Sequence, residues 1–172
     1  MTILNELLVG FWQIIKSPFQ DLSVLWLLVP IVVLWFTFEI YFGKHREEKL
    51  GWNTALGNGV SFCWVAVSVM KFIFTEMEQN FTWAKFFIIL ALLIYGLFIV
   101  YISFTHAFSE KVTYIFASPT AVYFLSGVGV LWGYGVLGIS LWVFIDLVIF
   151  FLLAMLLAWI LKRYIFKPKH KT

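Results

Sequence analysis

Five long apolar segments constrain the fold of this chain more than any other feature of its sequence. A helix of about 20 apolar residues crosses the ~30 Å hydrocarbon core of a bilayer. Of the 172 residues, 63% are hydrophobic and 12% are charged, whereas a soluble domain is about half apolar and about a quarter charged. We therefore predict an all-α integral membrane protein that forms one membrane domain over residues 1–172. The spans are expected at residues 22–42, 58–75, 83–105, 119–135 and 136–165.

A shorter apolar segment, residues 3–16, precedes these spans. Its sequence, ILNELLVGFWQIIK, gathers the apolar side chains into one helical stripe and leaves Asn5, Glu6, Gln13 and Lys16 elsewhere. Fourteen residues are too few to cross the hydrocarbon core. The pattern predicts an N-terminal amphipathic helix that lies in the membrane interface.

The basic residues indicate how the chain is oriented. Five of the twelve lie in the last eleven positions, so residues 166–172 form most of a basic tail. Such a tail is typical of a topology anchor rather than a nucleic-acid site. With five crossings, nine basic residues fall on the side of this tail and three on the other; if 119–135 re-enters instead, the division is eight to four. The positive-inside rule thus predicts a multi-pass protein of the cell membrane with a cytoplasmic C-terminus and no nucleic-acid partner.

Residues 126–138, SGVGVLWGYGVLG, contain five glycines in an apolar setting. The Gly133-Tyr134-Gly135 segment resembles the filter of potassium channels, which implies a pore lined by backbone carbonyls. The bulky Trp132 and the lack of an acidic residue after Gly135 depart from that pattern. The favoured interpretation is close helix packing through Gly129 and Gly133, with Gly135 and Gly138 in a tight outer turn.

Two acidic residues in the spans are the candidate functional groups, because a charged side chain in a bilayer needs a partner, a proton or water. Asp146 is expected at mid-depth in span 136–165, as an ion ligand or proton carrier, or as a hydrogen-bond partner of Ser126 or Tyr95. Glu39 is expected at the inner mouth, where it is also placed to cap the helix 58–75. The candidate ion or proton pathway is therefore Asp146, Glu39 and Ser126.

The sequence contains little that is typical of an enzyme. Its three histidines and Cys63 are scattered without partners at metal-ligand spacing. It has no nucleophile elbow and no carboxylate dyad at usable spacing. We expect no metal, no cofactor and no catalytic activity.

Residues 27–59, LLVPIVVLWFTFEIYFGKHREEKLGWNTALGNG, resemble small archaeal membrane proteins of unassigned activity. This resemblance implies a polytopic membrane protein and no functional residue. Two functions remain open: a small channel or transporter for ions or protons, formed by a homo-oligomer, and a structural or accessory subunit of a larger membrane complex.

Overall fold

The computed structural model describes residues 3–45, 51–76 and 82–165, and the predicted basic tail lies outside these ranges. Every regular element in them is a helix. In chain order they are α1 (Ile3–Lys16), the 3-10 turn η1 (Ser17–Phe19), α2 (Leu22–Lys44), α3 (Trp52–Thr75), α4 (Trp83–Thr105), α5 (Glu110–Ala117), α6 (Pro119–Gly133), α7 (Leu141–Ile160) and the π-helical turn η3 (Leu161–Ile165).

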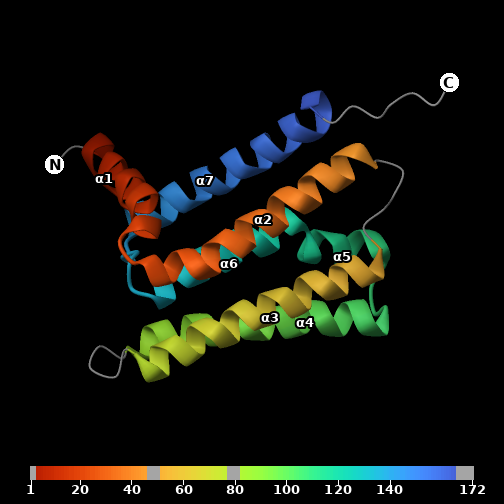
Figure 1. The fold of residues 1–172 in the computed structure, drawn as a ribbon, viewed down its shortest axis with the longest axis horizontal. Coiled ribbons are helices and arrows are strands. Elements are labelled where there is room, and N and C mark those ends of the chain that lie inside the picture. The colour runs from red at the N-terminus through yellow and green to blue at the C-terminus, as the bar shows by residue number, and fades with distance from the viewer. Residues whose placement is uncertain (1–2, 46–50, 77–81, 166–172) are drawn as a thin grey trace.

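Five helical segments are long and apolar enough to cross a membrane, which confirms the predicted fold class. They are α2, α3, α4, the pair α5–α6, and α7 with the start of η3. Successive segments run in opposite directions along the bundle, and α5–α6 extends from the end where α2 finishes to the end where α2 starts (Figure 1). Residues 119–133 therefore pass along the bundle rather than dipping in and returning.

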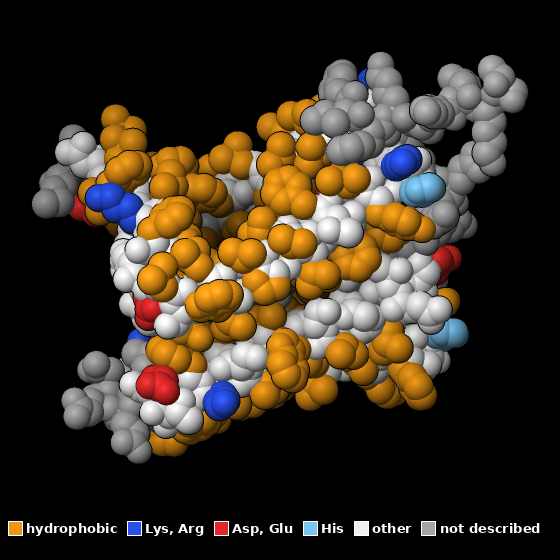
Figure 2. Space-filling model, viewed as in Figure 1, with side chains coloured by type: hydrophobic (Ala, Val, Ile, Leu, Met, Phe, Trp, Pro, Cys, Tyr) orange, Lys and Arg blue, Asp and Glu red, His pale blue; other side chains and the backbone are white. Residues whose placement is uncertain are grey.

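The centre of the bundle is α6, which packs against α2, α3 and α4. None of its residues is exposed. Helices α3 and α4 approach each other closely through two glycines. A Cβ at Gly59 would come within 2.9 Å of Ile99, and one at Gly96 within 2.7 Å of the Cys63 sulfur. The outer faces of the bundle are apolar (Figure 2), as the hydrocarbon of a bilayer requires.

A break in the fourth crossing divides α5 from α6. Ser118 has an extended backbone (ψ 136°), and Pro119 follows it without an N–H. The carbonyls of the last turn of α5 therefore need other donors. Asn58 Nδ2 donates to the Ala117 carbonyl at 2.8 Å, and the Tyr95 hydroxyl donates to the Phe116 carbonyl at 2.9 Å. Side chains from α3 and α4 thus satisfy a break that apolar surroundings would otherwise make costly.

Three helices differ by five residues or more from the limits expected from the sequence. Residues 110–117 form α5 rather than a loop, because Thr113 and Ala117 are buried on one face of this helix. Helix α3 begins at Trp52 rather than 58, and the Trp52 ring stacks on His106 at 4.1 Å. Helix α7 begins at Leu141 rather than 136, where the Ser140 side chain caps it by accepting from the Val143 N–H.

The Gly133-Tyr134-Gly135 segment forms the C-terminal turn of α6. The Tyr134 N–H donates to the Val130 carbonyl, and the Gly135 N–H donates to the Trp132 carbonyl. Gly135 has a φ of 73°, which favours glycine. The Tyr134 ring stacks on Phe72 at 3.8 Å. This folded turn is unlike the extended strand of a channel filter, so the potassium-channel interpretation is wrong for these residues.

Candidate functional site

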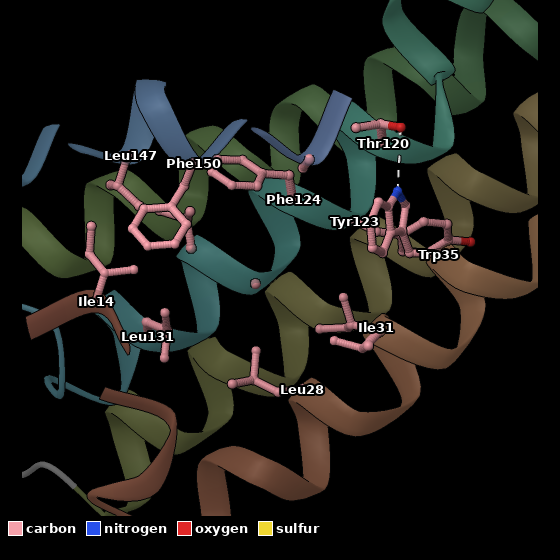
Figure 3. Close-up of a pocket in the computed structure, with 14 residues that line it drawn as sticks. Ile14, Leu28, Ile31, Trp35, Thr120, Tyr123, Phe124, Leu131, Leu147 and Phe150 are labelled. Carbon is pink, nitrogen blue, oxygen red and sulfur yellow. Dashed lines mark hydrogen bonds between the residues drawn. The ribbon is translucent and has the colours of Figure 1, made fainter. Parts of the chain in front are cut away.

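An apolar groove lies between α2 and α7, with α6 as its floor. Its cavity volume is about 210 Å³, larger than the ~150 Å³ apolar cavities that bind benzene. Figure 3 shows the groove running from Ile14 of α1 and Leu131 to Trp35 and Thr120, and Figure 2 shows the surface hollowed between α7 and α2. Its walls are almost entirely hydrocarbon and aromatic ring.

The groove exists because α7 packs mainly on α1 and, through η3, on α2, and is less closely packed on α6. Along its first half, α7 packs on α1, where Phe11 stacks on Phe150 at 4.8 Å. Beyond its end, η3 contacts α2. Between these points the floor and wall include small residues, Gly127 on α6 and Ala154 on α7. These residues leave space where larger side chains would fill the gap.

A buried polar cluster closes one end of the groove. The Trp35 indole N–H donates to Thr120 Oγ1 at 3.3 Å, and the Thr120 hydroxyl donates to Glu39 Oε1 at 2.6 Å. Glu39 Oε2 pairs with the ammonium of Lys162. We call these four residues the Glu39 cluster. Trp35 and Thr120 also line the groove, so the cluster connects the groove directly to the ion pair between the buried Glu39 and the partly exposed Lys162.

The Glu39 carboxylate is 1% exposed, and two features of its surroundings stabilise it. Thr120 is the second residue of α6, and the N-terminal turn of a helix favours a negative charge. Lys162 reaches Glu39 from η3 while a third of its side chain stays exposed. The predicted cap of the helix 58–75 is wrong, because Glu39 binds at the start of α6 and Gly51 caps α3.

Asp146 lies far from the Glu39 cluster. It is five residues into α7, about 7.5 Å from the start of that helix, whereas Glu39 is about 26 Å from the start of α2. Both helices start at the same end of the bundle (Figure 1). Asp146 is 2% exposed and lies against Gly10 of α1, where a Cβ would overlap its carboxylate. No described residue donates a hydrogen bond to its Oδ2.

The expected partners of Asp146 are engaged elsewhere. The Ser126 hydroxyl donates to the Val122 carbonyl of its own helix at 2.8 Å, and Tyr95 binds Phe116. Among the described residues, neither Ser126 nor Tyr95 is hydrogen-bonded to Asp146, and Asp146 and Glu39 lie apart. Along α7, from Leu141 to Ile160, every exposed side chain is apolar.

The four glycines singled out in the sequence lie at close contacts or in the turn after α6. A Cβ at Gly129 would come within 2.7 Å of Leu92 on α4, and one at Gly133 would overlap Val69 on α3. Gly135 adopts its positive φ in the turn. A Cβ at Gly138 would meet the Gln13 amide of α1 at 2.9 Å. These contacts are made within one chain.

Sequence reasoning missed three of the four residues in the Glu39 cluster. Trp35 lies four residues before Glu39, which places both side chains on one face of a helix. From its position in the sequence alone, Lys162 reads as part of the basic topology anchor at the C-terminal end of the chain. The spacing Trp35–Glu39 was a usable signal, but the pairing with Thr120 and Lys162 depends on the tertiary fold.

Searches against protein-family models, curated proteins and solved structures found no match to this chain.

Proposed function

We propose that this polytopic membrane protein binds one amphiphilic molecule from the bilayer, as a small carrier or transporter. The observation that supports this function is the groove between α2 and α7, apolar along its length and closed at one end by the Glu39 cluster. A hydrocarbon chain fits the apolar part, and a polar end group fits beside Trp35 and Thr120. Apolar pockets with a few convergent polar groups are the usual form of a ligand site.

An ion or proton pathway along the fourth and fifth spans is less well supported than the binding of an amphiphile, because of the side chains that these spans present. Such a pathway needs polar side chains that follow one another through the bilayer. The described exposed face of α7 offers apolar side chains, and α6 is covered by its neighbours. The groove is formed by a single chain, so ligand binding needs neither a second copy nor a catalytic residue.

The test is to fill the groove with a larger side chain and to measure how much amphiphile stays bound to the purified protein. Gly127→Phe places a ring on the groove floor, where a Cβ lies 3.7 Å from Leu28. Gly57→Phe is the matched control, because nothing lies within 4 Å of a Cβ at Gly57. Native mass spectrometry of the purified protein should show one retained amphiphile in the wild type and in Gly57→Phe, and its loss in Gly127→Phe. Equal lipid retention by all three proteins would overturn the proposal.

We also propose that the end of the bundle that contains α5 faces the cytoplasm. Among the described residues, Lys44, Lys111, Lys162 and Arg163 belong to this end, and Lys16, Lys71 and Lys85 belong to the other. This distribution follows the positive-inside rule. A membrane-impermeant label should reach a cysteine introduced at Lys111 only in inverted vesicles. Labelling of that cysteine in intact cells would show the opposite orientation.

A further inference from the structure

The charge at the closed end of the groove indicates which class of amphiphile fits it. Glu39 contributes a buried carboxylate. Thr120 donates a hydrogen bond to it, Trp35 donates one to Thr120, and both of these side chains line the groove. We propose that the ligand is a lipophilic cation and that Lys162 competes with it for Glu39. This inference rests on the proposed function of the groove.

The burial of Glu39 restricts which ligand charge the site accepts. An ionised carboxylate surrounded by hydrocarbon needs a compensating charge. In this structure that charge comes from the ammonium of Lys162. A ligand that is neutral leaves this pair intact and gains nothing from Glu39. An anionic ligand would have to draw Lys162 away and leave the buried carboxylate without a counter-ion, whereas a cationic ligand can replace Lys162 beside Glu39.

Lys162 reaches Glu39 through a side chain that is only partly buried. Its ammonium lies at the end of a flexible stem, and a third of the side chain is exposed. Lysine side chains near helix ends extend readily toward the membrane interface. Lys162 is therefore able to withdraw from Glu39 when another cation arrives, which makes the exchange of one ion pair for another feasible.

Aromatic side chains form the groove wall next to the Glu39 cluster. Trp35, Tyr123, Phe124 and Phe150 all line the groove. Faces of aromatic rings attract cations, most strongly when the ring is Trp and the site is desolvated. A cationic head group would pass Trp35 and Thr120, whose hydroxyl donates to Glu39, and would pair with the carboxylate in place of Lys162, with its hydrocarbon part extending toward Leu131.

The test compares three probes that share one alkyl chain: dodecylamine, dodecanol and dodecanoate. Binding of each radiolabelled probe is measured on the full chain in neutral-lipid nanodiscs at neutral pH, with empty nanodiscs subtracted. Wild-type protein should bind dodecylamine most tightly and dodecanoate least. Glu39→Gln should weaken dodecylamine by about tenfold or more and leave dodecanol unchanged, because only the cation loses an ion pair.

Variants of Lys162 test whether this residue competes with the cationic ligand for Glu39. Lys162→Met removes the competitor and should tighten dodecylamine binding, with no change for dodecanol. Arg163→Met is the matched control, because it removes the same charge from the adjacent residue of η3 and should not tighten dodecylamine. If Lys162→Met fails to fold with its unpaired carboxylate, the double variant Glu39→Gln/Lys162→Met should bind dodecylamine no better than dodecanol.

The outcomes separate this inference from the proposed function. Equal binding of dodecylamine and dodecanol, insensitive to Glu39→Gln, would overturn the inference while the groove still binds amphiphiles. Binding of all three probes that survives Gly127→Phe would overturn both. Weaker dodecylamine binding in Lys162→Met would contradict the competitor role, because it would make Lys162 a part of the binding site.

Discussion

Replacing Asn58 by leucine should destabilise the bundle by about 2–4 kcal/mol. Asn58 is fully buried, donates to the Ala117 carbonyl at 2.8 Å, and accepts from the Tyr123 hydroxyl at 3.0 Å. Leucine has a similar size but has neither the hydrogen-bond donor nor the acceptor of the Asn58 amide. The substitution leaves a carbonyl and a hydroxyl buried without this partner, and each such loss costs about 1–3 kcal/mol. Gained apolar contact offsets part of the sum.

The assay is reversible unfolding of the purified protein in mild detergent by a denaturing detergent, followed by tryptophan fluorescence. Asn53→Leu is the control, because Asn53 is exposed on the same helix and should change stability by less than about 0.5 kcal/mol. Tyr123→Phe removes one of the two bonds and should cost less than Asn58→Leu. A wild-type stability for Asn58→Leu would mean that water or another donor satisfies the α5–α6 break.

Two further predictions concern the end of the bundle near α1. Gly10→Ala should loosen α1 by about 1–3 kcal/mol, because its Cβ overlaps the Asp146 carboxylate; hydrogen exchange of α1 should rise, and Asp146→Ser should restore much of the protection. Burial, and then the negative charges of Asp21 and Glu76, raise the pKa of Tyr134, so the folded protein keeps this proton where an unfolded tyrosine, with a pKa near ~10, loses it. Stability should therefore fall above about pH 10, and an equally steep fall in Tyr134→Phe would exclude this residue as a cause.

The crossings of the membrane were predictable because lipid demands long apolar helices. Residues 83–105 form a helix with the predicted limits, since an uninterrupted apolar run carries one strong signal. Helix α5 was missed because its signal is weak. Its polar residues are those of a loop, and it is helical because Thr113 and Ala117 pack against neighbouring helices. Tertiary packing of this kind overrides local preference.

The candidate site was predictable only in part. A carboxylate inside a span is expected to have a function or a partner, and Glu39 was identified on that ground. Its partners Thr120 and Lys162 are 81 and more than 100 residues away in sequence, so no local pattern could pair them. The groove depends on where α7 is held, and a single sequence does not show the separation of two helices.

The central claim is that hydrocarbon from the bilayer enters the groove and reaches α6. The direct measurement places a photoreactive benzophenone amino acid at Phe124, a groove residue on a helix that has no exposed side chain. The same group at Phe62, which is 1% exposed in the core, is the control. After irradiation in nanodiscs, mass spectrometry should find lipid adducts at position 124 and only protein cross-links at position 62. Protein cross-links alone at both positions would contradict the account.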